Sequence, residues 1–140
     1  MKNKNKKIRL SKSCISEKEI NSVKKVLEKE FLGMGEEVKL FEEELTKFFS
    51  RNVVCVTNGT AALQLSIQAL NIKEDDEILI QSLTYLASVQ AIAANKAKPV
   101  FCDVYPETLT IDLNDAEKKL TNKTRAIMPV HYAGGVGNLD

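Results

Sequence analysis

The first candidate for a ligand-binding site is a short polar turn, Asn58-Gly59-Thr60. An apolar run at Val53 to Val56 precedes this turn, and apolar residues at helical spacing follow it over Thr60 to Leu70. The first N–H groups of a helix have no partner within the helix, and the helix dipole favours an anion there. Gly59 would permit a strained turn and a close approach, and the Thr60 hydroxyl could donate a further hydrogen bond. The turn therefore predicts a phosphate-binding helix N-terminus.

The same turn also has a purely structural interpretation, in which Thr60 does no more than cap the helix. If a phosphate does bind, the motifs that the sequence lacks restrict its source. There is no G-x-x-x-x-G-K-[ST] for a nucleoside triphosphate and no G-x-G-x-x-G for a dinucleotide. The next apolar run ends in Gln81-Ser82, whereas a dinucleotide site has an acidic residue there that binds the ribose. A nicotinamide or flavin cofactor is therefore disfavoured.

A second candidate is Tyr85, which follows the strand predicted at Glu77 to Gln81. Open α/β sheets bind their ligands at the carboxyl ends of the strands. Tyr85 could stack there on a flat cofactor ring. The alternative is a partly buried tyrosine that packs under a loop.

The elements that must position these residues follow from short apolar runs that alternate with helical stretches beyond Val53. The predicted strands are Val53 to Val56, Glu77 to Gln81, Pro99 to Asp103 and Arg125 to Val130. The predicted helices are Thr60 to Leu70, Leu86 to Ala94 and Asp112 or Leu113 to Leu120, the last capped by Asp112 or Asn114. The strands lack polar alternation, so helices should cover both sheet faces. An α/β fold with a three-layer α/β/α sandwich is predicted.

The first third of the chain has a different pattern. Residues 1–7 are almost all lysine and asparagine, which predicts a disordered basic tail. Ser16 and Glu19 form a capping box for a helix that should end before Gly33. A second amphipathic helix is predicted from the spacing of its apolar residues, Val38, Phe41, Leu45 and Phe48.

The composition is that of an ordinary globular chain, with 44% hydrophobic residues and a formal net charge of +1. This charge gives no field that would attract nucleic acid, and no apolar run is long enough to span a membrane. We therefore expect a cytoplasmic protein without nucleic-acid or membrane partners. The cysteines, Cys14, Cys55 and Cys102, are expected to be reduced thiols, and no metal site is predicted because His131 has no ligand-type neighbours.

Taken together, several stretches make the chain resemble the DegT/DnrJ/EryC1/StrS family, the pyridoxal-phosphate (PLP) aminotransferases of nucleotide-linked keto sugars. Their order and spacing hold from about Ile8 to Asp140. The matching stretches are Ile8-Arg9-Leu10-Ser11, Gly35-Glu36-Glu37-Val38 with Phe41-Glu42-Glu43, Thr57-Asn58-Gly59-Thr60-Ala61-Ala62-Leu63, Thr84-Tyr85 with Ala87-Ser88 and Ala91-Ile92, Pro99-Val100-Phe101-Cys102-Asp103-Val104 before Pro106-Glu107-Thr108-Leu109, and Ala126-Ile127-Met128-Pro129-Val130-His131-Tyr132-Ala133-Gly134.

The resemblance implies a fold-type I large domain whose N-terminal part is residues 8–140, with the sheet incomplete at the C-terminal end. It implies that the PLP phosphate is held at Gly59, Thr60 and Ala61, and that Tyr85 stacks on the pyridine ring. It places His131 and Tyr132 at the sheet edge without a defined role. It also places Leu32 to Gly35 near the entrance for the sugar nucleotide.

The resemblance further implies a homodimer that uses PLP, an amino donor such as glutamate and a nucleotide-sugar substrate, in surface polysaccharide or amino-sugar biosynthesis. The family's Schiff-base lysine and the aspartate that pairs with the pyridine nitrogen are expected beyond Asp140, so no catalytic residue is assigned in this chain. Two alternatives stay open. One is a PLP-dependent sugar dehydratase of the same family, in which histidine replaces that lysine. The other is an inactive truncated fragment with at most a binding role.

Overall fold

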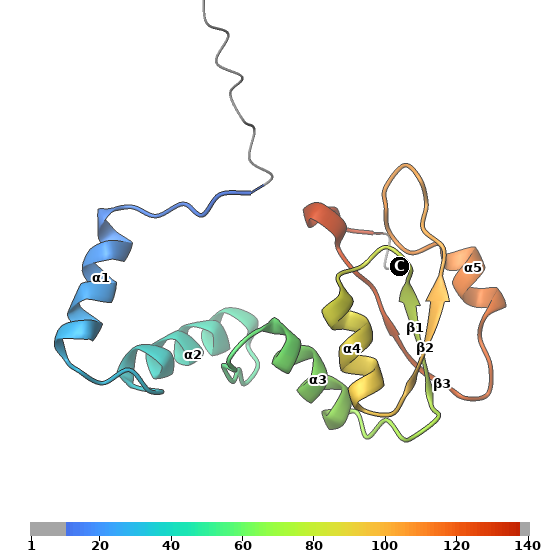
Figure 1. Cartoon of the computed structure of the whole chain (residues 1–140), viewed down its shortest axis with the longest axis horizontal. Coiled ribbons are helices and arrows are strands. Elements are labelled where there is room, and N and C mark those ends of the chain that lie inside the picture. The colour runs from blue at the N-terminus through green and yellow to red at the C-terminus, as the bar shows by residue number, and fades with distance from the viewer. Residues whose placement is uncertain (1–10, 138–140) are drawn as a thin grey trace, which may run out of the picture. The chain divides into compact units, whose positions relative to one another are not determined.

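The computed structural model describes residues 11–137, and the chain divides into two compact units, Met1–Cys55 and Val56–Asp140 (Figure 1). The predicted basic tail at residues 1–7 lies outside the described residues. In the part that is described, no helix is both long and apolar enough to cross a membrane.

The first unit contains helix α1 (Glu17–Glu28) and helix α2 (Glu36–Phe49). The capping box predicted at the start of α1 is confirmed, since the Ser16 side chain accepts from the helix backbone and Glu19 accepts from the Ser16 N–H. No residue of either helix is buried, although both have the apolar face that the sequence predicted.

The predicted strand at Val53 to Val56 is wrong: the structure has no strand over this segment. Two backbone N–H groups of this segment donate to side chains of α2 instead. The Val53 N–H donates to Thr46 Oγ1 at 3.1 Å, and the Cys55 N–H donates to Glu42 Oε1 at 2.7 Å. A donor that is satisfied by a side chain is not available for a strand ladder.

The second unit is a parallel sheet with helices on both faces, as Figure 1 shows. Its strands have the order β2-β1-β3, so β1 is central. The elements in chain order are α3 (Gly59–Ala69), β1 (Glu77–Gln81), α4 (Leu86–Ala94), β2 (Lys98–Cys102), α5 (Leu113–Lys118), β3 (Thr124–Met128) and the short 3-10 helix η1 (Tyr132–Gly134). The three-layer α/β/α arrangement predicted from the sequence is confirmed in this unit.

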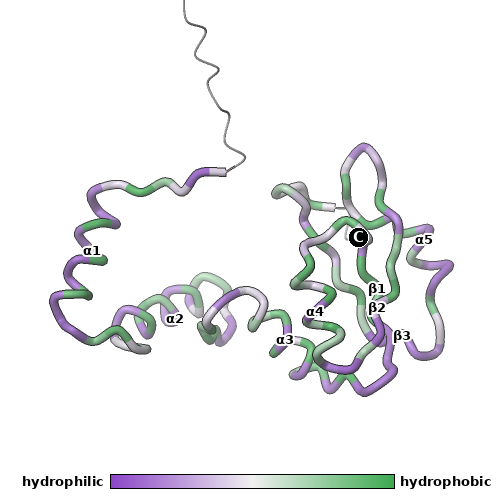
Figure 2. Tube along the Cα trace, viewed as in Figure 1, coloured by the Kyte–Doolittle hydropathy of each residue, from purple (hydrophilic) through white to green (hydrophobic). Residues whose placement is uncertain are grey.

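Both faces of β1 are buried against a layer of helix. On one face, Ile78 and Ile80 pack in a cluster with Ile67 of α3 and with Ile92 of α4. On the other face, Leu79 packs with a second cluster that includes Cys102, Ile111 and Ala116. Figure 2 shows the hydrophobic residues concentrated on β1 and α4. This burial explains why β1 has no polar alternation.

The ends of several elements differ from the predicted ones by one or two residues. β2 ends at Cys102 rather than at Asp103, and β3 ends at Met128 rather than at Val130. The Val130 N–H donates to the side chain of Gln81, so the ladder cannot continue through it. α5 is capped by Asp112, which was one of the two predicted caps.

Replacing Ile80 by alanine should destabilise the second unit by about 2 to 5 kcal/mol, because it opens a cavity at a side chain that is 0% exposed. Ile127→Ala on β3 is the matched control, and it should cost clearly less because that residue is 47% exposed. Urea unfolding followed by tyrosine fluorescence measures both costs. All three tyrosines, at 85, 105 and 132, lie in this unit. An equal decrease in the free energy of unfolding for the two variants would contradict the difference in burial between Ile80 and Ile127.

The stability of the second unit should also depend on Glu77, a buried carboxylate at the start of β1. Its Oε2 accepts from the Thr121 hydroxyl at 2.6 Å, and its Oε1 pairs with Lys98 Nζ at 3.3 Å. The Thr121 hydrogen bond is the main reason why the pKa of Glu77 lies below its ordinary value. A lowered pKa means that the carboxylate stabilises the fold above its unfolded-state pKa and that this contribution is lost as the pH falls through the folded-state pKa.

Glu77→Gln is therefore expected to reduce the drop in melting temperature between neutral pH and about pH 3. Thermal unfolding at a series of pH values measures this drop for the variant and for the wild-type chain. An unchanged pH dependence in the variant would show that Glu77 does not link folding to pH.

Candidate functional site

The N-terminus of α3 is capped by Asn58, which has an extended backbone conformation. Asn58 Oδ1 accepts from the Ala61 N–H at 2.9 Å, and the Asn58 carbonyl accepts from the Ala62 N–H at 3.1 Å. The first bond satisfies one of the N–H groups that the start of a helix leaves without a partner, and the second is the first hydrogen bond of the helix itself. Within residues 11–137, the N–H groups of Gly59 and Thr60 meet no acceptor.

Two expectations about this turn are wrong. Gly59 does not have the left-handed conformation of a strained turn; it is the first residue of α3. Thr60 is not the cap, because Asn58 occupies the N-cap position. A Cβ placed on Gly59 would have no atom within 4 Å, so open space borders its Cα.

The predicted cofactor residues Gly59, Thr60 and Tyr85 lie together around one open depression of about 570 Å³. Its remaining lining residues come from α3 and from the start of α4; they are Ala62, Leu63, Ser66, Ala87 and Ser88. Ala61, the fourth predicted cofactor residue, does not line this depression, and its N–H is engaged by Asn58. A role for Ala61 in binding phosphate stays a prediction.

Tyr85 stands at the N-terminal cap position of α4, and it is 81% exposed. The alternative in which this tyrosine packs under a loop is therefore wrong for this chain. Its ring is available to a flat ligand at the same depression that the Gly59 and Thr60 N–H groups border.

The groups around this depression suit the binding of a ligand that is both anionic and aromatic. Two unpaired N–H groups and the Thr60 hydroxyl suit an anion, and the exposed ring of Tyr85 suits an aromatic ligand. Its lining contains no lysine, histidine or carboxylate. Within residues 11–137, the His, Cys, Asp and Glu side chains form no group that could hold a metal ion.

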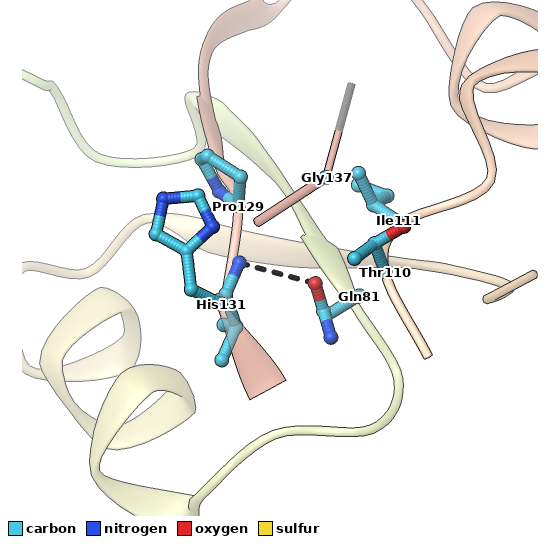
Figure 3. Close-up of a pocket in the computed structure, with 7 residues that line it drawn as sticks. Gln81, Thr110, Ile111, Pro129, His131 and Gly137 are labelled. Carbon is cyan, nitrogen blue, oxygen red and sulfur yellow. Dashed lines mark hydrogen bonds between the residues drawn. The ribbon is translucent and has the colours of Figure 1, made fainter. Parts of the chain in front are cut away.

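A second, much smaller pocket of about 10 Å³ lies at the same edge of the sheet, where β1 and β3 end (Figure 3). Gln81, Thr110, Pro129 and His131 line it. Gln81 is 0% exposed, and its side chain accepts a hydrogen bond from the Val130 N–H at 3.1 Å, which is drawn dashed in Figure 3.

The sequence had marked Gln81 only as a position without a dinucleotide-binding acid. The signal that could have found it is the polar residue that ends the otherwise apolar run Ile78 to Ile80, since buried glutamines need hydrogen-bond partners. His131 and Tyr85, both noted from the sequence, line separate pockets. Tyr132 begins η1.

The segment Leu32 to Gly35 belongs to the first unit. Leu32, Gly33 and Gly35 line a depression of about 330 Å³ there, together with Phe31. Its expected position near a sugar-nucleotide entrance stays a prediction.

Proteins with known names resemble this chain in sequence and in structure. The dTDP-4-dehydro-2,3,6-trideoxy-D-glucose 4-aminotransferase of Saccharopolyspora spinosa is 33% identical over 135 residues, which are 94% of this chain and 35% of that protein. A protein assigned as a sugar aminotransferase from Streptococcus pneumoniae, in its PMP form, superposes with a TM-score of 0.85 and 32% identity, over 94% of this chain and 33% of the other.

A second similar structure is that of an Escherichia coli GDP-4-keto-6-deoxy-D-mannose-3-dehydratase with bound hydrated PLP. It superposes with a TM-score of 0.78 and 28% identity, over 86% of this chain and 33% of the dehydratase. The chain spans about a third of the length of the curated relatives that it matches.

The model of one protein family matches residues 13–140, which is almost the whole sequence. The order of motifs, the parallel sheet and the capped helix at Asn58 agree with this match. The chain belongs to the DegT/DnrJ/EryC1/StrS aminotransferase family.

Proposed function

We propose that this chain forms the phosphate- and ring-binding part of a PLP-dependent aminotransferase that acts on a nucleotide-linked keto sugar. The observation that supports this best is the depression where the unpaired N–H groups of Gly59 and Thr60 lie beside the exposed ring of Tyr85. A phosphate and a flat aromatic ring are the two parts of PLP that a protein must hold without covalent bonds.

The residues present fit that cofactor. The open space beside the Gly59 Cα leaves room for a phosphate to approach the helix N-terminus, where the dipole favours an anion. The Thr60 hydroxyl can donate to a phosphate oxygen, and Tyr85 can cover one face of the pyridine ring. When bound, PLP supplies an electron sink for the chemistry at the substrate carbon.

The similar proteins support the reaction class. One is an aminotransferase of a dTDP-linked keto sugar, and another is a sugar aminotransferase in its PMP form. The same reasoning extends to an amino donor such as glutamate, to a homodimer, to a cytoplasmic location and to a place in surface polysaccharide or amino-sugar biosynthesis. These finer points rest on the family and on the sequence.

A sugar dehydratase of the same family is the second candidate, and its support is the likeness to the PLP-bound GDP-4-keto-6-deoxy-D-mannose-3-dehydratase. Both candidates use the cofactor in the same way at Gly59, Thr60 and Tyr85. The lysine or histidine that separates them is expected beyond Asp140.

The chain is expected to bind pyridoxamine 5′-phosphate, which needs no covalent bond to a lysine. In a titration followed by ¹⁵N–¹H NMR, the amide signals of Gly59, Thr60 and Tyr85 should shift. Pyridoxamine without its phosphate is the matched control ligand, and it should bind at least about tenfold more weakly because charge-assisted hydrogen bonds are lost. Tyr85→Ala should weaken binding of both ligands.

Equal affinity for the two ligands, or shifts that avoid α3 and Tyr85, would contradict the proposed cofactor site. Leu65→Ala on the far part of α3 is the control variant, since Leu65 is not among the residues that line the depression. It should leave the affinity unchanged.

A polypeptide of these 140 residues is expected to show no transaminase turnover, because no catalytic lysine is assigned within it. The assay supplies the purified chain with glutamate, PLP and a nucleotide-linked keto sugar, and it follows the formation of 2-oxoglutarate. Measurable turnover would show that a lysine of this chain can act, and it would remove the alternative of an inactive binding fragment.

A further inference from the structure

Gln81 is the last residue of β1, and it is buried with every polar atom of its side chain engaged. Its Nε2 donates to the carbonyl of Leu83 at 2.9 Å and to the carbonyl of Leu109 at 3.1 Å. Its Oε1 accepts from the Val130 N–H at 3.1 Å. The Gln81 side chain thus connects three segments, at Leu83, Leu109 and Val130, that are distant from one another in the sequence.

Each of these segments follows a different strand at the carboxyl edge of the sheet. Leu83 belongs to the turn that leads from β1 to Tyr85, and Leu109 lies between β2 and α5. Val130 follows β3 and precedes His131. Gln81 therefore ties together the connections in which an open α/β sheet builds its ligand site.

The Leu109 connection is strained. Leu109 has a φ of 57°, a left-handed conformation that costs a residue with a Cβ of order 1 kcal/mol or more. Such a conformation persists when surrounding bonds hold it. The hydrogen bond from Gln81 to the Leu109 carbonyl is one of these, and the Leu109 N–H bond to the Tyr105 carbonyl at 2.8 Å is another.

Only a primary amide fits this arrangement of partners. The site offers two carbonyl oxygens and one N–H, so it needs two donors and one acceptor on the same planar group. A carboxylate would keep the acceptor for Val130 but would place negative charge against two carbonyl oxygens. An apolar side chain would leave these three partly buried backbone groups without the hydrogen bonds that Gln81 makes, which costs free energy at each of them.

We propose that Gln81 is a positioning residue of the cofactor site: its amide holds the turn from Ser82 to Thr84 in the conformation that presents Tyr85 beside the N-terminus of α3. This inference rests on the proposed function for its effect on the cofactor. Gln81 does not line the depression itself, so it acts on the ligand through Tyr85.

The other hydrogen bonds of this turn agree with that role. The Ser82 N–H donates to the Cys102 carbonyl at 2.8 Å, and Thr84 Oγ1 donates to Ser88 Oγ at 3.1 Å. They attach the two ends of the turn to β2 and to α4. The bond from Gln81 attaches its middle, at Leu83, to the centre of the sheet edge.

The experiment compares Gln81→Glu, Gln81→Met and the wild-type chain by NMR. Gln90→Glu is the matched control, because it makes the same change on an exposed position of α4. In the wild-type chain, the two Nε2 protons of Gln81 and the Val130 amide proton should exchange slowly with water. Rapid exchange of all three would overturn the proposal without any variant.

In the free chain, Gln81→Met should shift the amide signals of Leu83 and Tyr85 and should expose the Val130 amide to exchange. Gln81→Glu should shift the same turn but leave Val130 protected, since it keeps the acceptor. This difference separates the donor role of Gln81 from mere filling of space. Unchanged Leu83 and Tyr85 signals in the methionine variant would overturn the proposal.

Both variants should bind pyridoxamine 5′-phosphate about tenfold more weakly than the wild type, and Gln90→Glu should bind within about twofold of it. If the glutamate variant does not fold, the affinity of the methionine variant decides whether Gln81 acts on the site. Wild-type affinity in a folded methionine variant would overturn the role of Gln81 at the site. If the wild-type chain itself does not bind this ligand, the proposed function fails, and the exchange measurements still decide whether Gln81 holds the turn.

Discussion

Water is excluded from both faces of β1, and most of the second unit follows from that constraint. A strand without a solvated face needs a helix layer on each side, and α3 with α4 supplies one of them while α5 belongs to the other. Because the neighbouring strands are parallel to β1, their connections gather at one edge of the sheet. A buried strand that ends at this edge must also satisfy whatever polar group it carries there, and Gln81 does so with three backbone partners.

At the candidate site, some N–H groups at the start of α3 are bonded within the chain, and others are free to bind a ligand. Asn58 takes the N–H groups of Ala61 and Ala62 through its side chain and its carbonyl. Among residues 11–137, the N–H groups of Gly59 and Thr60 have no hydrogen-bond acceptor. The cap thus fixes the direction of the helix and leaves its first two donors for an anion. The ionisable groups that the chemistry of a PLP enzyme requires are not among the residues around this depression.

The sequence predicted the helices, β1 and the layered fold well, because apolar periodicity and capping residues are local features. Ser16 with Glu19, and Asp112, are caps that can be recognised within four residues. The strand predicted at Val53 to Val56 failed for a reason that is not local: Thr46 and Glu42 of α2 take backbone donors that a ladder would need. The partners of Gln81 lie up to 49 residues away, so pattern analysis could not supply them. The strained turn expected at Gly59 is not found, because Gly59 is the first regular residue of α3 and follows the cap Asn58.

In the proposed site, Tyr85 and the start of α3 form one binding surface for a phosphorylated pyridine cofactor. An isotope-filtered NOE experiment on the labelled chain with unlabelled pyridoxamine 5′-phosphate tests this directly. We expect NOEs from the pyridine ring and methyl protons to the ring of Tyr85 and to Thr60, and none to Tyr105. NOEs to other parts of the chain in place of Tyr85 would contradict it.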